Sequence, residues 1–216
     1  ILWHGDGSRR AVALTFDDGP HLRDTPRVLD VLAKHDVHAT FHLVGKHAVY
    51  HRTLIRQIHS CGHQLALHCY RHIPFPLENM KMLRSQLEHT QNVIADSCGI
   101  APETIRDLRP PYGVFDQATL SRLTDWGYRL VMWNCMPPHW MQPLDRTIKQ
   151  LLRYAVPGSV IVLHDGHGHG TKVAQILDMI IPDLLARQFE FVTVEQMQTM
   201  ESASLLAKPD LPSETI

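Results

Sequence analysis

The chain has 216 residues, of which 44% are apolar and 20% are charged, and its formal net charge is -1. This composition is that of an ordinary globular protein, and the near-neutral charge gives no electrostatic basis for binding nucleic acid or an anionic membrane surface. No apolar run approaches the ~20 residues needed to span a bilayer, so we expect no transmembrane segment.

Apolar strand-like segments alternate with helical segments along almost the whole chain. We expect strands at residues 11–14, 39–44, 64–67, 105–108, 128–133, 159–163 and 189–194, and helices at 25–34, 45–60, 77–97, 117–126, 144–154 and 172–187. About seven β units joined by helical crossovers predict an α/β fold, a distorted (β/α)7-type barrel of parallel strands. We expect residues 1–201 to form a single domain and residues 202–216 to form a C-terminal tail.

Polar clusters follow five of the expected strands. They are Asp17 and Asp18 after the first strand, His68 and His72 after the third, Arg109 to Tyr112 after the fourth, Trp133 to Trp140 after the fifth, and His164 with Asp165 after the sixth. Carboxyl ends of parallel strands meet on one side of a barrel or open α/β sheet, and active sites gather there. The sequence therefore predicts one shared site.

Each cluster also has an ordinary structural interpretation. Asp18-Gly19-Pro20 is common turn chemistry, and Arg109 beside two prolines could be a loop residue in an exposed ion pair. The chain has 16 histidines, several of them four residues apart, so the spacing of His68 and His72 alone identifies no metal site. His167 and His169 compete with His164 as the functional imidazole, which we assign to His164 because it ends a strand. Trp126 and Trp133 are expected in the core.

Four short segments resemble a known family. They are Thr15-Phe16-Asp17-Asp18-Gly19-Pro20, His68-Cys69-Tyr70-Arg71-His72, Arg109-Pro110-Pro111-Tyr112 and Ile161-Val162-Leu163-His164. In combination and in this order they resemble the polysaccharide deacetylases of the carbohydrate esterase 4 type, the NodB-homology domain, over roughly residues 10–197. The resemblance implies that the chain is a metal-dependent hydrolase that removes acetyl groups from an N-acetylated polysaccharide such as peptidoglycan or a chitin-like oligomer.

The same resemblance implies a role for each motif residue. Asp18, His68 and His72 would bind a divalent metal, by default Zn²⁺, although Co²⁺ or Ni²⁺ would fit the same ligands. Asp17 would be the general base, oriented by Arg109, and His164 the general acid. The backbone N–H of Tyr112 would stabilise the oxyanion. Pro111, Trp140 and Leu163 would line the pocket that holds the acetyl group.

The segment after the fifth strand departs from the family pattern. There a tryptophan is commonly followed by Asp-x-x-Asp-Trp, whose first aspartate tunes the catalytic histidine. Here Met136 and His139 stand where the two acids would be, so that Asp165 or another acid would have to take over the tuning. Cys69 replaces the usual Ser or Thr after the first metal ligand.

These departures leave three hypotheses open. The first is the N-deacetylase, and the second is an O-acetyl xylan esterase or small-amide hydrolase of the same fold. The third is a catalytically silent carbohydrate-binding domain that lost its acid-tuning aspartate at Met136. The expected partner is an acetylated glycan, the oligomeric state is left open, and the family implies an extracellular, periplasmic or cell-envelope location. The first residues show no signal-peptide pattern.

Overall fold

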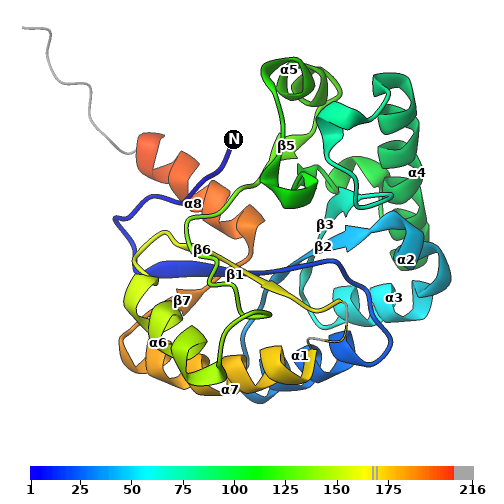
Figure 1. The fold of residues 1–216 in the computed structure, drawn as a ribbon. Helices are drawn as coiled ribbons and strands as arrows, with labels where there is room; N and C mark the ends of the chain where they lie inside the picture. The colour runs from blue at the N-terminus through cyan, green and yellow to red at the C-terminus, as the bar shows by residue number, and fades with distance from the viewer. Residues whose placement is uncertain (167, 169, 207–216) are drawn as a thin grey trace, which may run out of the picture.

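Seven parallel strands form one curved sheet in the computed structural model, which describes residues 1–166, 168 and 170–206 (Figure 1). The strand order is β5-β4-β3-β2-β1-β6, with β7 paired to β1. The strands are β1 (Ala11–Asp17), β2 (Thr40–Val44), β3 (Gln64–Cys69), β4 (Asp107–Leu108), β5 (Arg129–Leu130), β6 (Val160–His164) and β7 (Glu190–Phe191). The predicted α/β fold with parallel strands is confirmed, although strand pairing does not close the sheet into a full barrel.

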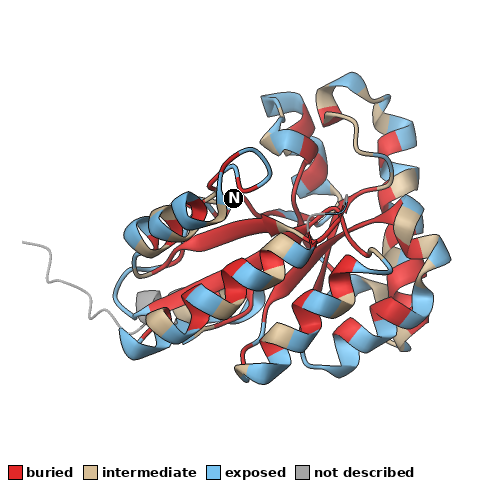
Figure 2. Ribbon diagram, turned by 60° about the horizontal axis from the view of Figure 1, so that its bottom comes forward, coloured by how far each residue is buried: buried red, intermediate tan, exposed pale blue. Residues whose placement is uncertain are grey.

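Helices cover the outside of the sheet. They are α1 (Asp24–Lys34), α2 (Gly45–Tyr50), α3 (Arg52–Ser60), α4 (Met80–Cys98), α5 (Gln117–Asp125), α6 (Leu144–Tyr154), α7 (Gly170–Ala186) and α8 (Val194–Leu206), with short 3-10 helices η1 (Phe75–Leu77), η2 (Pro102–Thr104) and η3 (Pro111–Gly113). The strands are buried, and the helices turn their buried residues towards them (Figure 2). No helix in the described part of the chain has the length and apolarity that a bilayer crossing requires.

Strand register decides which side chains enter the barrel. Phe16 pairs in register with Phe41 on one side and Leu163 on the other, and the rings of Phe16 and Phe41 stack at 4.9 Å. These three side chains belong to the core between sheet and helices. Since side chains alternate along a strand, the next residues, Asp17 and His164, project to the opposite face, which is the barrel interior.

The gap between β5 and β6 is crossed by residues 131–135. The Val131 N–H donates to the Leu108 carbonyl at 2.9 Å, and the Val162 N–H donates to the Cys135 carbonyl at 2.9 Å. This segment therefore runs from the β4 side of the sheet to the β6 side. The chain then continues into the loop that carries Met136 and Trp140.

Helix α8 covers the opposite end of the barrel from this loop and was not expected from the sequence. The Val194 N–H donates to Thr40 Oγ1 at 3.0 Å, and the Glu195 N–H donates to Gln64 Oε1 at 2.9 Å. Polar side chains of β2 and β3 thus bind the first free N–H groups of the helix. The helix also crosses the predicted boundary between residues 201 and 202, and residues 207–216 of the predicted tail lie outside the described residues.

Candidate active site

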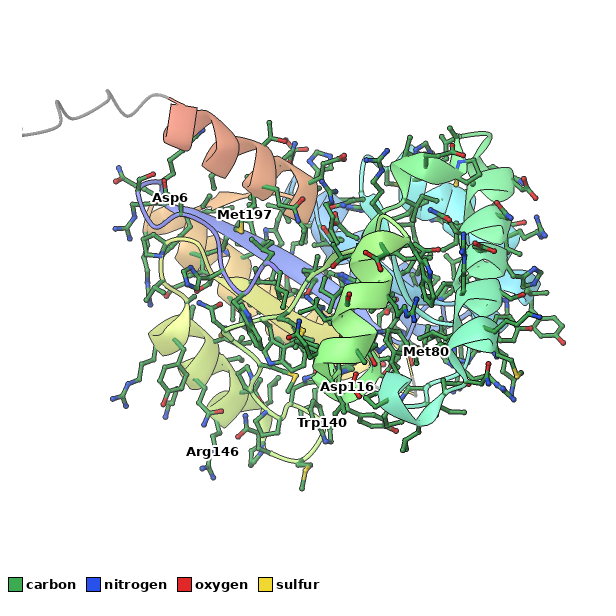
Figure 3. The ribbon with its side chains drawn as sticks, turned by 90° about the horizontal axis from the view of Figure 1, so that it is seen from above. Asp6, Met80, Asp116, Trp140, Arg146 and Met197 are labelled. Atoms are coloured by element: carbon green, nitrogen blue, oxygen red, sulfur yellow. The ribbon has the colours of Figure 1, made fainter. Side chains whose placement is uncertain are left out.

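The five polar clusters meet at the carboxyl ends of the strands, around a cavity of about 440 Å³. Its walls come from β1, β3, β6, η3 and the loop between β5 and α6, where Trp140 lies (Figure 3). The lining residues are Asp17, Asp18, His68, His72, Pro110, Tyr112, Gly113, Trp133, Met136, Trp140 and His164.

Asp18, His68 and His72 form one compact cluster in this cavity. One potential ligand atom from each lies within 4.8 Å of the others. Nε2 of His72 is 3.1 Å from Nε2 of His68, and the two nitrogens are 3.3 and 3.5 Å from Asp18 Oδ1. His68 Nδ1 is 2.8 Å from the Arg109 carbonyl, which keeps the proton on Nδ1 and leaves the Nε2 lone pair facing the cluster. Two imidazoles and a carboxylate arranged in this way fit a divalent metal with open coordination positions.

The electrostatics of the cluster favour an ionised carboxylate. Burial opposes the ionisation of Asp18, but hydrogen bonding and charge from His68 outweigh it, so the pKa of this carboxyl lies well below its ordinary value. For His68, burial lowers the pKa, but the charges of Asp17 and Asp18 more than compensate and raise it. Asp18 occupies the left-handed region with φ of 71°, a conformation that aspartate tolerates better than most residues.

Asp17 is held by a fully buried arginine. Arg109 Nη1 donates to Asp17 Oδ1 at 2.6 Å and to Thr15 Oγ1 at 2.8 Å. Arg109 Nε donates to the Val131 carbonyl at 3.0 Å and Nη2 donates to the Met132 carbonyl at 3.1 Å, which fixes the position of the guanidinium. Asp17 Oδ2 accepts no hydrogen bond from the described residues and remains available to a molecule in the cavity.

His164 sits between two rings. Its ring centroid is 5.1 Å from that of His139 and 5.0 Å from that of Trp140. Its Nδ1 is buried and has no hydrogen-bond partner within the described chain. Burial lowers the pKa of His164, and the negative charges of Asp17 and Asp18 only partly oppose this. Asp165 does not replace the missing acid in the described chain, because His164 Nδ1 has no hydrogen-bond partner there, and the recorded bond of the Asp165 carboxylate is from the Thr25 hydroxyl.

The turn η3 shapes the other wall. Tyr112 and Gly113 both have positive φ, of 58° and 69°, and the Tyr112 ring centroid lies 4.4 Å from that of His72. A Cβ on Gly113 would lie 2.5 Å from the Trp133 ring, so this glycine lets the turn approach the tryptophan. Trp133 also lies 5.7 Å from the Arg109 guanidinium.

Most sequence-predicted residues come together, but not all. Asp17, Asp18, His68, His72, Tyr112, Trp140 and His164 line the cavity, and Arg109 lies directly behind Asp17. Pro111 is buried and is not among the lining residues, where Pro110 appears instead. Leu163 also does not reach the cavity, since strand alternation turns it into the core. Trp133, which was expected in the core, lines the cavity, while His167 and His169 lie outside the described residues.

A family model for polysaccharide deacetylases matches residues 4–131, which is more than half of the chain. The chain belongs to the polysaccharide deacetylase family. This confirms the family predicted from the four motifs, although residues 132–216, which include Met136 and His164, lie beyond the matched segment.

Curated relatives and solved structures agree with this membership. The chain is 36% identical over 197 residues to a peptidoglycan-N-acetylglucosamine deacetylase of Bacillus cereus, covering 89% of this chain and 70% of the relative. It is 32% identical over 208 residues to a chitooligosaccharide deacetylase of Bradyrhizobium, covering 90% and 94%. The crystal structure of the Bc1960 peptidoglycan N-acetylglucosamine deacetylase, in complex with 4-naphthalen-1-yl-N-oxidanyl-benzamide, superposes with a TM-score of 0.85 at 34% identity, covering 90% of this chain and 91% of that one.

The comparisons also confirm the reaction class predicted from the sequence. Members of this deacetylase family are metal-dependent hydrolases that remove acetyl groups from polysaccharides, and the cluster of Asp18, His68 and His72 offers a fitting metal site. The named relatives act on acetylated glycans of the bacterial cell wall or on chitooligosaccharides.

Proposed function

We propose that this deacetylase hydrolyses the N-acetyl groups of a peptidoglycan- or chitin-like glycan at the cell envelope or outside the cell, with Zn²⁺ held by Asp18, His68 and His72. The observation that supports this most is the placement of three metal-ligand side chains beside a buried Asp17–Arg109 pair in one cavity. The names of the relatives support an N-acetylated substrate.

The residues divide the reaction between them. When bound, the ion supplies Lewis-acid chemistry, which makes water more acidic and polarises an acyl oxygen. Asp17 Oδ2 takes one proton from the attacking water, while the hydrogen bond from Arg109 holds the Asp17 carboxylate in place. The backbone N–H of Tyr112 donates a hydrogen bond to the acetyl oxygen as negative charge develops there. His164 gives a proton to the departing amine, so that water and amide become acetate and a free amine.

The ligand set favours zinc. Two imidazoles and one carboxylate suit Zn²⁺ with positions left for water and substrate, and Co²⁺ or Ni²⁺ fits the same donors. Trp133, Met136 and Trp140 give the cavity an apolar wall beside this site, which suits an acetyl methyl group.

A silent carbohydrate-binding domain is the main competing proposal, and one observation favours it: His164 Nδ1 lacks the carboxylate expected at Met136. The Asp17–Arg109 pair weighs against silence. Burying an ion pair is costly compared with apolar residues of similar size, so a binding-only groove would gain nothing by keeping it. An O-acetyl esterase would use the same residues as the proposed N-deacetylase, so only the substrate that is hydrolysed distinguishes the two.

The test is acetate release by the zinc-loaded chain from N-acetylglucosamine oligomers and from acetylated xylan. We expect acetate from the oligomers, and we expect Asp17→Asn to lower the rate at least about 100-fold because it removes the base. Asp30→Asn, at an exposed position of α1, is the matched control and should retain full activity. Acetate from xylan alone would indicate the O-acetyl esterase, and a folded zinc-bound chain that releases no acetate from either substrate would favour the binding domain.

A further inference from the structure

His42 is a fully buried histidine in the middle of β2, one register position beyond the paired Phe16 and Phe41 and therefore alongside Asp17. Its Nδ1 lies 3.5 Å from Asp17 Oδ1. Neither ring nitrogen has a hydrogen-bond partner among the described residues. The opposite neighbour in β3 is Ala66, whose small side chain leaves room for the imidazole inside the barrel.

A buried imidazole without a partner is unfavourable, because both ring nitrogens lose their hydrogen bonds to water. An apolar side chain would fill the same space without that cost. The unsatisfied ring therefore calls for an explanation, and the only carboxylate recorded within 4 Å of it in the described chain belongs to Asp17.

The charge state of His42 determines what it can offer. Burial, together with the positive charges of Arg109 and His68, lowers the pKa of His42 well below its ordinary value, so the ring is neutral at neutral pH. A neutral imidazole carries one proton, on either Nδ1 or Nε2. Beside a carboxylate oxygen the form with the proton on Nδ1 is favoured, because a lone pair facing Oδ1 would be repelled.

We propose that His42 is a positioning residue for Asp17, donating from Nδ1 to the oxygen that Arg109 also binds. The role rests on the proposed function of Asp17 as general base. His42 lies in β2 and Arg109 directly follows β4, so the two donors approach from different strands and together limit rotation of the carboxylate about its axis. Oδ1 is then held inside the barrel, and Oδ2 points to the cavity where water is deprotonated. The separation of 3.5 Å is at the outer limit of a hydrogen bond, as is often found for catalytic groups in structures without substrate.

Two near-isosteric substitutions isolate the donor. His42→Asn keeps an N–H close to the position of Nδ1, whereas His42→Leu has nearly the same shape without it. In zinc-loaded protein acting on N-acetylglucosamine oligomers, we expect kcat of His42→Leu to be about tenfold or more below that of His42→Asn, because a hydrogen bond to a charged group is lost. KM should differ less than about twofold between them, since His42 does not line the cavity. Equal kcat values in two folded variants would overturn the proposal.

A second readout does not depend on activity. A long-range ¹H–¹⁵N correlation spectrum of zinc-loaded protein with ¹⁵N-labelled histidine identifies the protonated nitrogen of His42, whose signals are those missing from both variants. We expect the proton on Nδ1, and a proton on Nε2 would overturn the contact. If the wild-type chain released no acetate, the proposed function and with it the role of His42 would fall, while the spectrum would still decide whether the contact to Asp17 exists.

Discussion

Arg109 shows at the scale of one residue why the motif needs this amino acid. Its side chain has no exposed surface, yet its charge is compensated by Asp17 and its N–H groups reach four different oxygen atoms. Lysine cannot reproduce this, because an ammonium group is a point charge without the planar fork of a guanidinium. The residue thus fixes the carboxylate of Asp17 and also ties β4 to the segment that crosses from β5 to β6.

We therefore predict that Arg109→Lys damages both activity and stability. The rate of acetate release should fall about 100-fold because Asp17 is misplaced, and the free energy of unfolding should fall by about 3 kcal/mol because buried polar groups lose partners. Urea unfolding and steady-state kinetics measure the two effects. Arg9→Lys, at an exposed ion pair with Glu190, should change neither, and an Arg109→Lys variant with wild-type kinetics would show that Arg109 does not orient the base.

The sequence allowed us to predict which residues belong to the site where they lie in a motif. It did not where their place in the site depends on strand pairing. Asp18, His68 and His72 were predicted together and lie together. His42 has no local signal, since only the pairing of β1 with β2 brings it to Asp17. Leu163 was placed in the pocket by the family resemblance, and strand alternation turns it into the core instead.

Helix α4 shows at the scale of an element how the local sequence fixes boundaries. Asn79 caps its first turn, with Oδ1 accepting from the Lys81 and Met82 N–H groups at 3.0 and 3.3 Å, and Gly99 ends it at φ of 67°. These signals are local, so the helix predicted at residues 77–97 lies close to the observed Met80–Cys98. The break at His51, which divides the helix predicted at 45–60 into α2 and α3, has no comparable glycine or proline signal.

The cap gives a prediction for this element. Asn79→Ala should lower the free energy of unfolding by about 1 kcal/mol, because two N–H groups lose their acceptor. Asn92→Ala, at an exposed position inside the same helix, should leave stability unchanged or slightly raise it, since alanine is the better helix former. Chemical denaturation of both variants measures the difference. Equal stabilities would mean that the cap adds nothing to α4.

At the scale of the whole molecule, the two ends of the barrel differ in structure: one carries a polar network and the other the candidate active site. The end covered by α8 holds a polar network in which Gln64 Nε2 donates to Asp107 at 2.6 Å and Arg129 binds the same carboxylate at 3.0 and 3.1 Å. The other end holds the cluster of Asp18, His68 and His72 and the cavity. The parallel sheet could be anticipated from the β/α alternation. Helix α8 was not predicted, although a local capping box marks its start: the Gln196 N–H donates to Thr193 Oγ1 at 3.2 Å, and the Thr193 N–H donates to Gln196 Oε1 at 2.8 Å.

The most direct test of this account is zinc content measured beside acetate release. The purified chain is stripped with a chelator, reloaded with Zn²⁺ and assayed on N-acetylglucosamine oligomers, with His72→Ala in parallel. We expect stripping to abolish acetate release and reloading to restore it, with about one zinc ion bound per chain, and we expect His72→Ala to bind zinc weakly and release little acetate. Full acetate release by a chain that elemental analysis shows to be free of metal would contradict the account.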